Sequence, residues 1–176
     1  MNNRRHPSIE QATLVRVDLG ERAYDVVIGG GLIQRTGELL KPLLKRPRTV
    51  VVTDRNVANH HLANLSASFD TEGIDHQAII LDPGEATKDF AHFEELANLL
   101  LDTEVERSDT IVALGGGVVG DLVGFVASVF RRGIRFVQLP TTLLAQVDSS
   151  VGGKTGINTA HGKNLVGSFH QPSLVV

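Results

Sequence analysis

TIVALGGGVVGD, residues 110–121, carries the clearest indication of the fold class. It opens with an apolar run of strand length and turns through three glycines, Gly115 to Gly117. An almost entirely apolar segment, residues 118–130, follows and predicts a helix buried on all sides. A buried strand that passes through a tight turn into a buried helix is the first half of a βαβ unit. The stretch therefore predicts an α/β protein.

Other short apolar runs extend this pattern along the chain. They are TVVVT (49–53), AIIL (78–81) and RFVQLP (135–140). Between them, residues 88–101 carry Phe90, Phe93 and Leu100 at helical spacing, and Thr87 is the expected N-cap. Strands about thirty residues apart with helices between them predict a Rossmann-like parallel sheet with flanking helices.

The two ends of the chain differ from this pattern. Alternating apolar residues from Val15 to Leu19 and from Tyr24 to Ile28 predict an antiparallel N-terminal β-hairpin. Residues 1–12 are expected to be disordered, and residues 13–176 to form one α/β domain. The last residues, SFHQPSLVV, stop at Val176 in an apolar extended run. Because a parallel strand needs both faces covered, we expect the natural chain to continue.

Composition excludes several classes of function. The 176 residues include no cysteine, which excludes disulfides, thiolate metal sites and a cysteine nucleophile. A net charge of −3 argues against a nucleic-acid partner. No apolar run approaches the roughly 20 residues that span a bilayer, and no signal peptide is recognisable. A cytoplasmic protein without a membrane partner is expected.

The turns after the predicted strands hold most of the candidate site residues. In an open parallel sheet, ligands bind outside the carboxyl ends of the strands. The turns there carry Asp54; Gly84, Glu85 and Lys88; Gly116 to Asp121; and Thr141 with Thr142. Each has a simpler interpretation: helix caps for Asp54 and the threonines, and a surface i,i+3 pair for Glu85 and Lys88.

GGGVVGD, residues 115–121, is the most specific of these turns. Bare N–H groups at the start of a helix, together with the helix dipole, suit a pyrophosphate. The alternative is a tight turn without a ligand. The pattern departs from G-x-G-x-x-G and lacks the acid expected about 20 residues later, so Asp54 is the candidate for the adenosine ribose. Asp121 either touches the cofactor or only complements the dipole.

VDSSVGGKTGINTAHGKN, residues 147–164, shows no helix or strand period, and we expect a flexible, donor-rich loop. Lys154 and Lys163 suit a carboxylate and a phosphate, unless they are ordinary surface lysines. Arg131, Arg132 and Arg135 add anion-binding capacity or form a solvated basic rim. The histidines, His161 and His170 included, lack recognisable metal-ligand spacing.

Three stretches together resemble the 3-dehydroquinate synthase family: GGGVVGD, RGIRFVQLPTTLLAQVDSSVGGKTGIN and GKNLVGSFHQP. The resemblance runs from about Thr49 to Val176. It implies an enzyme of the shikimate pathway that uses NAD⁺ and a divalent metal, zinc or cobalt. Such enzymes convert the seven-carbon sugar acid phosphate DAHP to 3-dehydroquinate and phosphate. An alcohol is transiently oxidised, phosphate is eliminated, the ketone is reduced, and an aldol step closes the ring.

The resemblance also implies roles for residues. Positions that match cofactor-binding residues are Asp54, Gly84, Glu85, Lys88, Gly116, Gly117, Val118, Val119, Gly120, Asp121, Thr141, Thr142, Lys154 and Lys163. Positions that match residues at the substrate and nicotinamide are Asp148, Lys154, Lys163 and Asn164. Arg132 matches an arginine offered to the substrate phosphate across a dimer interface, so a homodimer is expected. Residues 147–164 would then be a hinge-like anion clamp.

The sequence departs from the family pattern in one respect. The family's metal ligands, a glutamate and two histidines, lie on a helical domain that residues 1–176 do not include. We therefore expect no metal site in this chain and no turnover by it alone. Alternatives are a cyclase that makes valiolone- or inosose-type rings, an iron- or zinc-dependent alcohol dehydrogenase, which would release NADH, and a stand-alone nucleotide-binding module.

Overall fold

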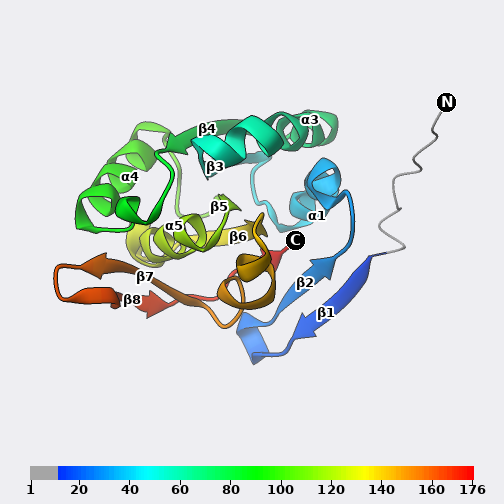
Figure 1. Ribbon diagram of the computed structural model, residues 1–176. Coiled ribbons are helices and arrows are strands. Elements are labelled where there is room, and N and C mark those ends of the chain that lie inside the picture. The colour runs from blue at the N-terminus through cyan, green and yellow to red at the C-terminus, as the bar shows by residue number, and fades with distance from the viewer. Residues whose placement is uncertain (1–11) are drawn as a thin grey trace.

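The structure, a computed structural model, describes residues 12–176 and contains a seven-stranded sheet in the order β1-β2-β9-β6-β5-β3-β4 (Figure 1). The strands are β1 (Thr13–Val17), β2 (Tyr24–Ile28), β3 (Arg48–Asp54), β4 (Asp75–Leu81), β5 (Thr110–Gly115), β6 (Arg135–Pro140) and β9 (Leu174–Val175). All neighbours pair in parallel except β1 and β2, which form the predicted antiparallel hairpin. The predicted fold class is confirmed. The predicted disorder of residues 1–12 falls, apart from residue 12, outside the described residues.

Helices cover both faces of the sheet. The longer ones are α3 (Ala63–Glu72), α4 (Phe90–Asp102) and α5 (Gly117–Val129). Shorter helical segments are η2 (Gly20–Arg22), η3 (Leu32–Arg35), α1 (Thr36–Leu40), η4 (Lys41–Leu43), α2 (Arg55–Val57), η5 (Ala58–Leu62), η6 (Glu85–Thr87), η7 (Phe130–Arg132) and η8 (Ala145–Ser149). No helix within residues 12–176 is long and apolar enough to cross a membrane.

The core consists of two apolar clusters, one on each face of the sheet. Successive side chains of a strand point to opposite faces. Val50 and Val52 of β3 therefore pack toward α4 and α5, whereas Val51 packs with Leu65 and Phe69 of α3. A strand buried on both faces is apolar without alternation, which is why the sequence predicted these strands.

The start of α4 differs from the prediction. The helix begins at Phe90, and its N-cap is Asp89, whose carboxylate accepts a hydrogen bond from the His92 amide at 2.9 Å. Thr87 instead ends a short 3₁₀ turn, where its hydroxyl donates to Gly84 O. Both Asp and Thr are favoured at the N-cap, with Asp ranked higher, and Asp89 occupies that position two residues after Thr87.

The predicted loop over residues 147–164 is wrong in its second half. Lys154–Thr159 (β7) and Gly162–Phe169 (β8) form an antiparallel hairpin that packs against α5. Glycine and asparagine have low strand propensity, so the local pattern hides the strands. Tertiary packing overrides it: a Cβ on Gly124 of α5 would lie 3.1 Å from Phe136 Cζ and closer still to the Thr155 methyl.

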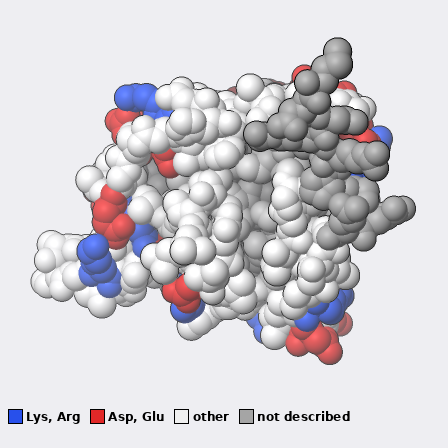
Figure 2. Space-filling view, turned by 45° about the vertical axis from the view of Figure 1, so that its right-hand side comes forward, with Lys and Arg blue, Asp and Glu red and all other residues white. Residues whose placement is uncertain are grey.

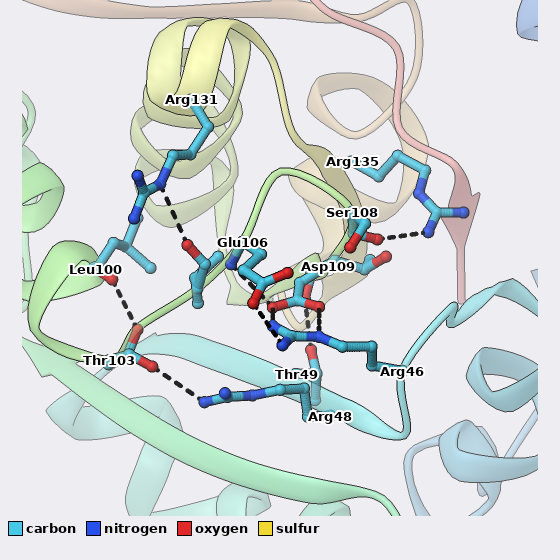
Figure 3. A network of polar contacts seen from close by, with 12 residues as sticks. Arg46, Arg48, Thr49, Leu100, Thr103, Glu106, Ser108, Asp109, Arg131 and Arg135 are labelled. Atoms are coloured by element: carbon cyan, nitrogen blue, oxygen red, sulfur yellow. Dashed lines mark hydrogen bonds and ion pairs between the residues drawn. The ribbon is translucent and has the colours of Figure 1, made fainter.

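Four arginines hold the loop that leads into β5 (Figure 3). The loop, residues 103–109, lies at the amino ends of the strands, opposite the turn between β5 and α5. Arg48, Arg131 and Arg135 donate to its carbonyl oxygens at Thr103, Val105 and Ser108. Arg46 makes a two-point contact with Asp109. Arg131 and Arg135 therefore bond this loop at the amino ends of the strands. They do not lie at the carboxyl ends, where the candidate site residues were expected.

Candidate functional site

The glycine turn places the start of α5 against the segment that follows β6. Gly116 is the N-cap of this thirteen-residue helix and provides no side-chain cap. A Cβ on Gly116 would lie 3.0 Å from the Thr142 methyl, and one on Gly117 would lie 3.0 Å from Ser149 Oγ. The first amide groups of a helix have no intrahelical acceptor. Glycine thus permits this close approach, and the amides of Gly117, Val118 and Val119 have no acceptor within the helix.

The segment that follows β6 also carries several hydroxyl groups. Thr141 Oγ1 and Ser150 Oγ are buried without a hydrogen-bond partner among the described residues. Thr142 Oγ1 accepts from the Ala145 amide at 3.3 Å, which confirms a capping role for this threonine. Open amides, an uncapped helix start and unpartnered hydroxyls fit a phosphate-bearing cofactor.

Lys88 lies at the centre of the site. Its side chain is 5% exposed and donates to Asp121 Oδ2 and, at 2.5 Å, to Asn164 Oδ1. The interpretation of Glu85 and Lys88 as a surface pair is therefore wrong, because Lys88 turns inward to α5. Burial raises the pKa of Asp121, and the hydrogen bond from Lys88 offsets this effect only in part.

Glu85 faces the hairpin instead. Its Oε1 accepts from Asn158 Nδ2 at 2.8 Å and lies 3.7 Å from Lys163 Nζ. The Asn158 hydrogen bond is the main cause that lowers the pKa of Glu85, and the charges of Lys88 and Lys163 add to it. The structure thus brings together five predicted site residues from three segments: Glu85, Lys88, Asp121, Lys163 and Asn164.

Two hollows flank this cluster. The first, of about 470 Å³, is lined by Asp121, Asp148, Ser149, Lys154, Thr155, Gly156, Asn164, Leu165, Gly167, Ser168 and Phe169. The second, of about 530 Å³, is lined by Glu85, Ala86, Lys88, Asp89, Phe90, Ala91, Asn158, Thr159 and Ala160. In the first, Lys154 Nζ lies 3.8 Å from Asp148 Oδ1, and both side chains are more than half exposed.

Two predicted site residues lie apart from the cluster. Asp54 caps α2, since its Oδ1 accepts from the amides of Asn56 and Val57 at 2.9 and 3.0 Å. Its ribose contact stays a prediction. Arg132 lies in the turn after α5, with a positive φ of 63°, at the far end of that helix from Asp121. Its role across a dimer interface also stays a prediction.

Sequence reasoning missed Asn158, although it bonds Glu85 and Asn164. Its position in an apparently irregular stretch gave no signal, and only the pairing of β7 with β8 brings it to the cluster. Within residues 12–176, no group of three His, Asp or Glu side chains lies close enough to hold a metal ion. His170 stacks on Phe136, and its Nε2 lies 2.9 Å from Ile134 O.

Charged side chains near the surface are mixed in sign. Figure 2 shows basic and acidic groups side by side in small clusters on a largely uncharged face. This face therefore carries no large patch of a single sign of charge.

Comparison with solved structures gives the class. 2-Deoxy-scyllo-inosose synthase, solved with carbaglucose-6-phosphate, NAD⁺ and Co²⁺, matches 93% of this chain and 44% of its own with a TM-score of 0.84 and 25% identity. 2-Epi-5-epi-valiolone synthase from Streptomyces hygroscopicus, solved with NAD⁺ and Zn²⁺, matches 90% of this chain and 44% of its own with a TM-score of 0.80 and 31% identity. The described residues thus have a Rossmann-like fold of the kind found in these sugar phosphate cyclases.

Sequence comparison gives the family. The protein-family model described as "3-dehydroquinate synthase N-terminal" matches residues 78–176 of this chain. The chain therefore belongs to this family. The 3-dehydroquinate synthase of Rhodospirillum rubrum is 60% identical over 166 residues, which are 94% of this chain and 43% of that protein. The chain thus spans less than half the length of this curated relative.

Proposed function

We propose that this chain is the cofactor-binding half of a 3-dehydroquinate synthase, a lyase that converts DAHP to 3-dehydroquinate and phosphate. One observation carries the proposal. Asp121 of α5 and Asn164 of β8, both bonded to Lys88, line one hollow together with Asp148 and Lys154, and α5 begins at the uncapped glycine turn. A pyrophosphate site beside lysines for an anionic substrate suits an enzyme that keeps its cofactor next to a sugar acid phosphate.

The residues present fit NAD⁺. The amides from Gly117 to Val119, which have no acceptor within the helix, would receive the pyrophosphate, with Thr141 and Thr142 beside it. Asp54 would hold the adenosine ribose through its carboxylate. When bound, NAD⁺ supplies a hydride acceptor that takes a hydride from a substrate alcohol and later returns it. Lys88 and Glu85 would also contact the cofactor, because both lie in the turn after β4 and line the second hollow beside the cluster.

Lys154 and Lys163 would bind the substrate's carboxylate and phosphate. Each lies near a carboxylate, at 3.8 Å from Asp148 and 3.7 Å from Glu85, and all four side chains are substantially exposed. Exposed pairs of this kind are weak, at about 0–1 kcal/mol, so a substrate anion can compete with them. Arg132 would reach the phosphate bound by a second copy, which makes a homodimer part of the proposal.

The residues described do not fit a catalytic metal, because they bring no three suitable ligands together. We therefore expect the zinc or cobalt of the whole enzyme to be held by residues other than those described. A cytoplasmic location, and the assignment of residues 13–176 as one NAD-binding domain, belong to the same proposal.

Phosphate release from DAHP, with and without NAD⁺ and zinc, tests the proposal. Residues 1–176 alone should release none, and adding the remaining domain of a full-length relative should restore NAD⁺-dependent release. Release by residues 1–176 alone would contradict the predicted lack of a metal site. Free NADH formed from a simple alcohol would point to an alcohol dehydrogenase instead.

A further inference from the structure

Asn158 lines the second hollow and bonds Asn164, which lines the first. Its Nδ2 donates to Glu85 Oε1 at 2.8 Å, and its Oδ1 accepts from the Asn164 amide at 3.0 Å. Its own amide donates to the Lys88 carbonyl oxygen at 2.7 Å. Asn164 in turn accepts from Lys88 Nζ. Asn158 is therefore bonded to both the turn that carries Lys88 and the strand that carries Asn164, whose side chains bond each other.

The hairpin is shaped to present this residue. The pairing of β7 and β8 is interrupted between Ile157 and Thr159, directly at Asn158. Asn164, across the hairpin, has a φ of +57°, a conformation that asparagine tolerates better than most residues. Bulges of this kind occur next to active sites, where they re-aim side chains. Here the irregularity turns Asn158 and Asn164 toward the turn that carries Glu85 and Lys88.

We propose that Asn158 is a positioning residue that holds the β7–β8 hairpin on the turn at residues 84–88 and so fixes Lys88 and Asn164 at the cofactor; its catalytic meaning rests on the proposed function. The chemistry requires an amide side chain. Its neighbours are a carboxylate acceptor, Glu85, and an N–H donor, Asn164, so one residue must both donate and accept. An aspartate at position 158 would still accept from the Asn164 amide, but its carboxylate would repel that of Glu85. An alanine would neither donate nor accept a hydrogen bond.

Hydrogen exchange tests the tether without reference to function. In Asn158→Asp, the Asn164 amide should exchange at least about tenfold faster than in the wild-type protein, because the hairpin opens locally more often. Asn158→Ala should do the same without an added charge. The matched control is Asn98→Asp, an identical change at an exposed site on α4, which should leave the rate within about twofold.

A double-mutant cycle tests the pairing with Glu85. Glu85→Gln combined with Asn158→Asp exchanges donor and acceptor, because the new glutamine can donate to the new aspartate. Asn158→Asp should weaken NAD⁺ binding about tenfold or more in the wild-type background, the effect of losing one hydrogen bond to a charged group. In the Glu85→Gln background, Asn158→Asp should weaken NAD⁺ binding by less than about threefold.

Two results would overturn the inference. One is an Asn158→Asp protein that matches Asn98→Asp in exchange and in NAD⁺ affinity. The other is an equal cost of Asn158→Asp with and without Glu85→Gln. If the wild-type protein does not bind NAD⁺, the proposed function fails, and the exchange rates still decide whether Asn158 holds the hairpin.

Discussion

Lys88 is a buried cation whose charge is matched within the protein. It is paired with Asp121, whose side chain is 18% exposed, and it also bonds Asn164. Removing two charges from water is costly, so such a pair adds little net stability, whereas removal of one partner leaves the other uncompensated. The pKa of Asp121 is raised by burial even with Lys88 present, which shows that burial dominates at this carboxyl group.

Lys88→Met should destabilise the protein by about 3 kcal/mol near neutral pH, the range for breaking a buried pair. The pKa of Asp121 should rise further, since the hydrogen bond that lowers it is lost. The loss of stability should shrink as pH falls through the raised folded pKa of Asp121, and it should stay constant below about 4, where Asp121 is protonated in the folded and unfolded states alike. Urea unfolding at several pH values measures this. In Lys88→Met with Asp121→Asn the loss should be smaller, and equal losses would contradict the pairing.

The pKa of Asp109 is lowered, in contrast to the raised pKa of Asp121. Burial acts to raise its pKa, but the hydrogen bonds from Arg46 and from the Glu106 amide outweigh burial and lower it. A lowered pKa in the folded state gives stability that is present above the unfolded value of about 3.9 and is lost as pH falls through the folded value. Asp109→Asn should therefore be less stable than the wild-type protein at pH 7, and the difference should narrow in acid. A constant difference between pH 7 and pH 2 in urea unfolding would contradict this account.

Among the elements, α5 and the β7–β8 hairpin define the site, and the sequence predicted only one of them. The segment at residues 118–130 is apolar all round, a pattern that predicts a buried helix wherever it packs. Strand β7 instead buries Thr155, Gly156 and Ile157 against α5, and two of these residue types give no hydrophobic signal. Likewise, nothing local distinguishes Lys88 from a surface lysine. Its burial depends on Asp121, which is 33 residues away.

The close approach of β7 to α5 makes Gly124 sensitive. Gly124→Ala should lower the free energy of unfolding by about 1–3 kcal/mol, because the new methyl group overlaps Thr155. Thr155→Ser removes the overlapping methyl and keeps the hydroxyl that bonds Ser168 O at 2.9 Å. The double variant should therefore recover most of the loss in urea unfolding. If Thr155→Ser gave no recovery, the packing of the hairpin would have to differ from that described.

At the scale of the whole molecule, the order of the strands within the sheet could not be predicted from the sequence. The parallel strands β3, β4, β5 and β6 follow from apolar runs and spacing. The two-residue strand β9 (Leu174–Val175) lies in the extended run that the sequence predicted, but its pairing with β2 and β6, which joins the N-terminal hairpin to the main sheet, could not be predicted. Tertiary pairing alone places the first and last segments of the domain side by side (Figure 1).

We expect the glycine turn at the start of α5 to bind the pyrophosphate of NAD⁺. The most direct test is calorimetric titration of residues 1–176 with NAD⁺, comparing the wild-type protein with Gly117→Val, whose side chain would fill the space beside Ser149. We predict saturable one-to-one binding that Gly117→Val weakens at least about tenfold, about 1.4 kcal/mol, while the protein stays folded. A folded wild-type chain that does not bind NAD⁺, or equal binding by Gly117→Val, would contradict the account.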